Sequence, residues 1–93
     1  MTIQTRSPLE RLDIGEIFGQ VIQELRRQRG LSQEALGFES GLHRTYVSLL
    51  ERGKRIPTLV TIFLLATALD LPPSEIVHRV ESRLGWSAEK IVE

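Results

Sequence analysis

The feature that most constrains the fold is a set of glycines that end helical patterns. Gly30, Gly41, Gly53 and Gly85 each follow a segment in which apolar residues recur at the spacing of one helix face. Glycine is common just past a helix, because it adopts the left-handed conformation without strain. Sustained alternation of apolar and polar residues, which would indicate strands, is absent. The sequence therefore predicts an all-α fold of short helices.

The first predicted helix begins near Ile14 and stops before Gly30. Asp13 and Glu16 have the spacing of a capping box, in which each side chain bonds a free backbone N–H. The helix is amphipathic, and its apolar face consists of Ile14, Phe18, Val21, Ile22 and Leu25.

Two shorter helices are predicted on either side of Gly41, over residues 33–39 and 43–52. Ser32 is a suitable N-cap for the first of them. Its candidate buried residues are Ala35, Leu36 and Phe38, and those of the second helix are Leu42, Tyr46, Val47 and Leu50. The two helices therefore meet across a tight glycine turn.

Two more helices follow, one capped by Thr58 and running to Leu69, the other opened by Pro72 and Pro73 and running to about Leu84. A short helix over residues 87–92 completes the pattern. We predict one all-α domain of five helices over residues 13–84, with a flexible arm at 1–12 and an extension at 85–93.

Composition excludes several classes of function. The 93 residues contain no cysteine, which removes disulfides, thiolate metal sites and cysteine nucleophiles. His43 and His78 lie far apart without an evident nucleophile, and no glycine-rich phosphate loop occurs. We therefore expect no enzyme activity, metal, cofactor or small-molecule ligand. The longest apolar stretch, 59–71, is too short for a membrane span and no signal peptide is evident, so a cytoplasmic protein is expected.

A joint pattern of short segments carries a resemblance to a known family. It consists of Leu31-Ser-Gln-Glu-Ala-Leu, Ser40-Gly-Leu-His-Arg-Thr-Tyr-Val-Ser, Leu50-Glu-Arg-Gly-Lys-Arg and Pro57. Over residues 18–71 the chain resembles the helix-turn-helix regulators of the lambda repressor and Cro type, and in finer detail restriction-modification controller proteins and short single-domain repressors. The resemblance implies a lambda repressor-like fold and a transcriptional regulator that binds double-stranded DNA.

The family docking mode places the second helix of the pair, about 43–52, in the major groove. Arg44, Thr45 and Ser48 are then the expected base contacts, with Arg44 able to grip guanine through two hydrogen bonds. Expected phosphate or positioning contacts are Gln33, His43, Tyr46, Arg52, Lys54 and Arg55. The competing interpretation is that these polar residues only solvate one face of an amphipathic helix and its loop.

The charge distribution supports a DNA-binding role even though the net charge is zero. Residues 26–55 carry seven Lys or Arg and three Glu, a formal charge of +4, while the remaining positions carry five and nine, a charge of −4. A basic segment of this kind favours phosphate contacts whose strength falls with salt.

The resemblance also implies two structural features. Arg26 and Glu51 occupy positions that form a partly buried ion pair in several relatives. Val60, Leu64 and Thr67 share a helix face that relatives commonly fill with polar residues. An apolar face of this kind indicates a twofold partner. We expect a homodimer through Val60, Phe63, Leu64, Thr67, Ile76, Val77, Val80, Leu84 and Trp86, with a monomer covered by its own C-terminal segment as the alternative.

Other interpretations stay open at this point. The helix-turn-helix scaffold also suits a protein-interaction module or an antitoxin-like protein that grips a protein partner, with or without DNA. Residues 1–12, with Arg6 and Arg11, are either an arm that follows the DNA or a frayed terminus.

Overall fold

The structure is a computed structural model that describes residues 13–86, and within that range it contains five α-helices and no strand. The helices are α2 (Ile14–Gln28), α3 (Gln33–Ser40), α4 (Arg44–Glu51), α5 (Leu59–Leu69) and α6 (Pro73–Leu84). The all-α prediction is confirmed, and each predicted helix boundary lies within about one residue of its observed position. The predicted arm and the predicted helix over 87–92 fall outside the described residues.

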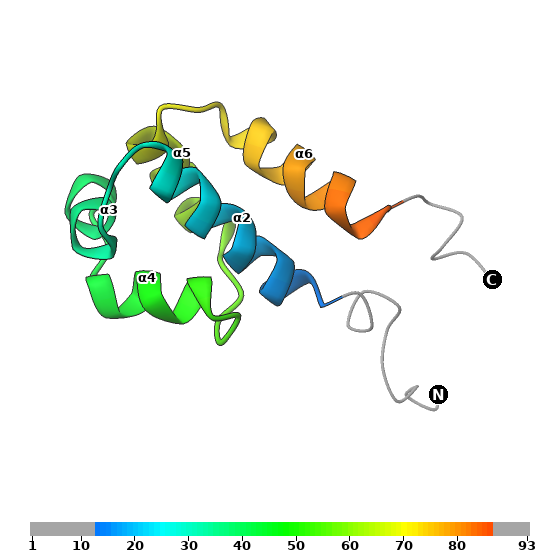
Figure 1. The fold of residues 1–93 in the computed structure, drawn as a ribbon, viewed down its shortest axis with the longest axis horizontal. Helices are drawn as coiled ribbons and strands as arrows, with labels where there is room; N and C mark the ends of the chain where they lie inside the picture. Colours follow the sequence, from blue (N-terminus) through cyan, green and yellow to red (C-terminus); the bar gives the residue numbers. More distant parts are fainter. Residues whose placement is uncertain (1–12, 87–93) are drawn as a thin grey trace.

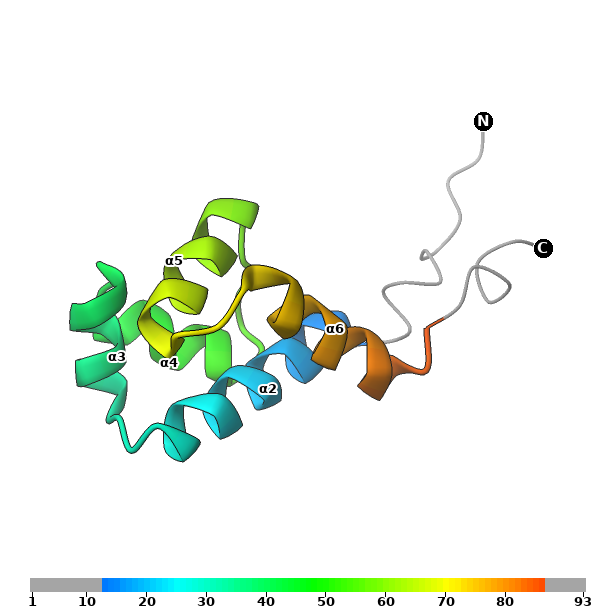
Figure 2. The same ribbon diagram turned by 90° about the horizontal axis from the view of Figure 1, so that it is seen from above.

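The five helices form a ring in which each packs on two neighbours around one core (Figures 1 and 2). α2 lies between α4 and α6, α3 packs on α4 and α5, and α5 packs on α6. The core residues are Phe18, Val21, Ile22, Leu25, Leu36, Val47, Leu50, Leu65, Ala66, Ala68, Leu69, Ile76 and Val80. Every helix contributes to this core, so the position of α4 is fixed by the rest of the fold.

Side chains cap three of the helices. The Ser32 hydroxyl accepts a hydrogen bond from the Ala35 N–H at 3.0 Å, and the Thr58 hydroxyl accepts one from the Thr61 N–H at 3.1 Å. These two caps were predicted and are confirmed. The capping box at Asp13 is wrong: Asp13 is left-handed (φ 54°), and its side chain makes no cap bond. A capping side chain normally reaches the free N–H groups from extended backbone, which Asp13 does not adopt.

The four glycines that end the sequence patterns all have positive φ, between 62° and 78°. A fifth glycine has another role. Gly19 lies inside α2, where that helix crosses the end of α4, and a Cβ placed on it would lie 2.6 Å from the Glu51 carbonyl oxygen. Because backbone is the obstacle, only glycine allows the two helices to approach this closely.

One predicted core residue is exposed to solvent instead. Phe38 is 88% exposed, because it lies on the side of α3 opposite to the buried Leu36 and Ser40. No single helix among residues 13–86 is long and apolar enough to cross a bilayer; α5 and α6 meet that criterion only together, and a bend of 106° separates them.

Candidate nucleic-acid interface

The outer face of α4 carries the polar residues that the sequence singled out. Arg44 and Thr45 are exposed and Ser48 is half-buried, whereas Val47 and Leu50 on the opposite face are fully buried. Thr45, Ser48 and Arg52 follow one another at helical spacing, which places them along one stripe. The helix therefore presents hydroxyl and guanidinium groups to solvent while its apolar side holds it to the core.

The turn between α3 and α4 sets the angle between them. The Leu42 N–H donates to the Gly37 carbonyl at 2.8 Å, and Gly41 takes the left-handed conformation that ends α3. A Cβ on Gly37 would lie 2.6 Å from the Leu42 carbonyl oxygen, so α3 and the start of α4 are in direct backbone contact. This tight turn leaves little freedom for one helix to move against the other.

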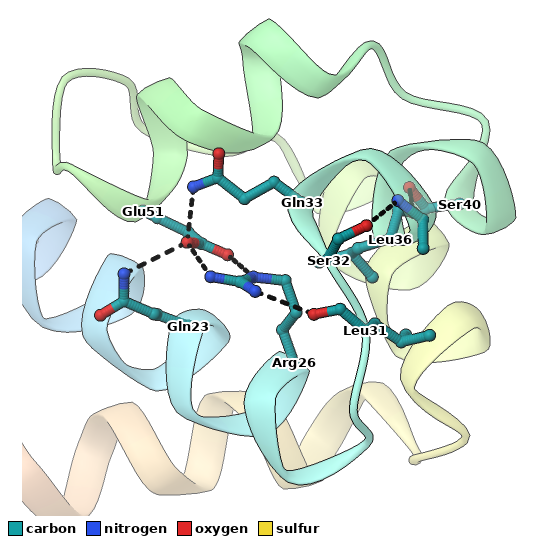
Figure 3. Close-up of polar contacts among 9 residues, drawn as sticks. Gln23, Arg26, Leu31, Ser32, Gln33, Leu36, Ser40 and Glu51 are labelled. Carbon is teal, nitrogen blue, oxygen red and sulfur yellow. Dashed lines mark hydrogen bonds and ion pairs between the residues drawn. The ribbon is translucent and has the colours of Figure 1, made fainter.

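A buried ion pair ties α4 to α2 (Figure 3). Arg26 donates from Nε to Glu51 Oε2 at 2.7 Å and from Nη2 to Glu51 Oε1 at 3.0 Å. The two side chains are only 9% and 1% exposed. The hydrogen bonds that Arg26 donates to the Glu51 carboxylate raise the pKa of Arg26 above its ordinary value. The predicted contact between these residues is therefore present, and neither charged group faces solvent.

The same carboxylate also fixes the start of α3. Gln33 donates from Nε2 to Glu51 Oε1 at 2.9 Å, and Gln23 donates to that oxygen at 3.4 Å (Figure 3). The third nitrogen of Arg26 reaches the Leu31 carbonyl at 2.8 Å. The sequence predicted that Gln33 positions the protein on DNA; in the structure its amide nitrogen donates one N–H to Glu51, which leaves the other N–H and the amide oxygen for such contacts.

His43 is the N-cap of α4. Its Nδ1 accepts a hydrogen bond from the Thr45 N–H at 3.0 Å, so the imidazole ring caps the helix as a serine or threonine hydroxyl does at other helix starts. Tyr46 is half-buried against the core, and its hydroxyl lies 3.5 Å from that of Thr61. Its ring therefore has a packing role, as predicted.

Basic residues continue past the end of α4. Arg52, Lys54 and Arg55 are all exposed. The chain turns here through backbone bonds from Gly53 and Lys54 to the last turn of α4, at 3.1 and 2.8 Å. The three cations therefore extend the polar face of α4 in the direction of the loop.

Sequence reasoning missed one acidic residue at this surface. The Glu34 carboxylate lies 3.6 Å from Arg44 Nη1, and both side chains are mostly exposed, at 74% and 65%. No periodic pattern indicates this pair, because the two residues belong to different helices and meet only through the α3–α4 turn.

A second, apolar surface lies on α5. Leu59, Val60 and Phe63 are 69%, 67% and 53% exposed, and Leu64 and Thr67 lie beside them. We refer to these five residues as the α5 face. Such a cluster is unusual on a monomer surface and typically marks an interaction site.

The contribution predicted from α6 to this surface needs correction. Ile76 and Val80 pack inward against their own core, because the same helix face must cover α2 and α5. Val77 and Trp86 remain accessible and Leu84 is half-buried. They line an apolar groove of about 480 Å³ between α2, α5, α6 and the loop before α5.

Two short helices joined by a glycine turn, the second with a polar outward face, define a helix-turn-helix protein. A comparison with family models agrees, since residues 22–76 match the helix-turn-helix model. The match covers more than half of the chain. The chain belongs to the helix-turn-helix family of DNA-binding transcriptional regulators.

Individual relatives narrow this assignment. The chain is similar to the restriction-modification controller protein C.AhdI from Aeromonas hydrophila, at 56% identity over 66% of this chain and 92% of that one, with a TM-score of 0.64. It is 41% identical to the control protein C.SmaI from Serratia marcescens, over 73% of this chain and 81% of the relative. A regulator from Sinorhizobium fredii, y4dJ, is also 41% identical over 71% and 86%. These relatives are regulators, and the predicted family is confirmed.

Proposed function

We propose that this protein is a homodimeric regulator that reads a roughly palindromic operator by inserting α4 into the major groove. The observation that carries the proposal is the polar, exposed outer face of α4. The opposite side of this helix packs on the core, and the buried Arg26–Glu51 network holds its end in place. A major groove accepts one helix, whose side chains then reach base edges. Arg44, Thr45 and Ser48 are the proposed base contacts.

The basic loop supports the proposal with contacts that do not depend on sequence. Arg52, Lys54 and Arg55 are exposed at the end of α4, where the family docking mode brings the sugar-phosphate backbone. Gln33 and His43 lie at the starts of α3 and α4, where helix dipoles favour a phosphate. We propose that these residues supply affinity and register.

Substitutions in the two groups of residues test these roles. We expect Arg44→Ala to lose about 1 to 3 kcal/mol of discrimination at the base pair that it reads, because a bidentate contact is removed. Lys54→Ala should weaken binding to every duplex and reduce the salt slope by about one. Sites selected from random DNA, followed by mobility shifts on selected and scrambled duplexes over a salt series, measure both. Identical binding by parent and variants would contradict the assignment.

The α5 face supports the dimer. Its apolar residues have no partner among the described residues that would cover them, and a twofold axis through α5 buries them against their own copies. A symmetric dimer places two α4 helices at successive major grooves, so the half-sites should lie about 34 Å apart. Two base-reading helices also double the length of sequence that is recognised.

We expect Phe63→Lys to convert the dimer into a monomer, because two ammonium groups would meet close to the proposed axis without counter-charges. Phe38→Lys is the matched control: the phenylalanine is even more exposed, at 88%, but lies on α3 outside the α5 face. Sedimentation equilibrium measures the association state. A parent chain that sediments as a monomer, or a Phe63→Lys variant that remains dimeric, would contradict the proposed interface.

A further inference from the structure

The Glu34–Arg44 pair is the one ion pair that joins the proposed base-reading residue to another element within residues 13–86. The atoms Oε1 and Nη1 lie 3.6 Å apart. The turn between α3 and α4 brings the two residues near each other, because the Leu42 N–H donates to the Gly37 carbonyl and Gly41 reverses the chain between the two helices. Glu34 itself sits in the first turn of α3, where the helix dipole stabilises a carboxylate.

A negative charge beside Arg44 opposes binding to a polyanion, so the role of Glu34 must be something other than raising the affinity for DNA. The other two carboxylates of the basic segment are placed differently. Glu51 is buried and neutralised by Arg26. Glu39 is exposed and makes no ion pair with any residue of the described part of the chain. Of these three carboxylates, only Glu34 lies within ion-pair distance of Arg44, the proposed base-reading residue.

We propose that Glu34 is a specificity-determining residue that directs Arg44 to a base and away from the phosphate backbone; the inference rests on the proposed DNA-binding function. A phosphate that approached Arg44 would meet the Glu34 carboxylate as a like charge. Guanine O6 and N7 carry only partial negative charges, so the repulsion that they meet is much weaker. An arginine has five N–H donors, so its guanidinium can remain near Glu34 with one edge and present the other edge to guanine.

Water screens this pair in the free protein, and its effect on folding is small. Docking on DNA removes that water, and both the attraction to Arg44 and the repulsion of phosphate then grow. Glu34 therefore acts on the choice of DNA sequence rather than on stability, and the readout that distinguishes the two is base preference at a single position.

The test is Glu34→Gln, measured beside Glu39→Gln, which removes the same charge from the same helix. We expect Glu34→Gln to raise affinity for scrambled duplex by about twofold to fivefold and to reduce discrimination at the Arg44 base pair by a similar factor. Glu39→Gln should raise affinity for both duplexes alike and leave discrimination unchanged. Melting temperatures of both variants should stay close to that of the parent, because the helix dipole contributes little at an exposed carboxylate.

A double variant shows whether Glu34 acts through Arg44. In the Arg44→Ala background, Glu34→Gln should cause no further loss of discrimination; an additional loss would mean that Glu34 reads a base itself and would overturn the inference. So would discrimination by Glu34→Gln equal to that of the parent. A parent chain that binds no duplex selectively would instead contradict the proposed function, and the two failures are therefore separate.

Discussion

Replacing Gly19 with alanine is expected to lower the free energy of unfolding by about 2 kcal/mol, the scale of overpacking in a tight core. The added methyl group would lie 2.6 Å from the Glu51 carbonyl oxygen and 2.8 Å from the Glu51 carbonyl carbon. Those atoms are backbone, so α2 and α4 must move apart to admit it. Urea unfolding followed by circular dichroism measures the change.

Gly15 provides the matched control, because it lies one turn earlier in α2 and is also buried. A Cβ there would meet the terminal methyl group of Ile56 at 2.7 Å, an atom that a flexible side chain can move away. Alanine also has the better helix propensity, by about 1 kcal/mol. Gly15→Ala should therefore be neutral or stabilising, and equal losses at both sites would contradict the argument from backbone contact.

Substitution of Glu51 by alanine is expected to cost about 3 kcal/mol or more of folding free energy, because it leaves the Arg26 guanidinium buried without its counter-charge. The loss includes the hydrogen bond from Gln33, which also ends on this carboxylate. Thermal and urea unfolding measure it. If the network dominates, Arg26→Met combined with Glu51→Ala should be less destabilised than the sum of the single variants.

An exposed ion pair serves as the comparison. Glu24 on α2 accepts two hydrogen bonds from Arg83 on α6, and both are solvent-accessible. The bonds from Arg83 lower the pKa of Glu24 below its ordinary value. Water screens this pair, so Glu24→Ala should destabilise the protein far less than Glu51→Ala. Similar losses for the two variants would show that burial is not the controlling factor.

The helices and most of their ends could be predicted from the sequence, because the signals are local. Ser32 and Thr58 cap their helices through hydrogen bonds to residues only three positions away. The glycines that end helices need only their own backbone freedom. Asp13 failed as a cap because its backbone is left-handed, which the spacing to Glu16 does not reveal.

Features that depend on two helices meeting could not be predicted in the same way. The sequence shows a glycine at position 19 but not that α4 crosses it, and it shows Glu34 and Arg44 without their proximity. The assignment of Ile76 and Val80 to a dimer interface failed for a related reason. Helical spacing identifies an apolar face on α6 but does not distinguish a partner from the chain's own core.

The position of Glu51 also has a consequence for dynamics. Its carboxylate accepts hydrogen bonds from side chains of α2 and α3, and its own backbone lies at the end of α4. Local opening of any one of these segments would therefore leave a buried charge without some of its hydrogen bonds. Amide protons in the three segments should therefore exchange with solvent as one cooperative unit. If the three segments open only together, the binding surface that they form is already ordered before it meets its ligand. Little conformational entropy is then lost on binding.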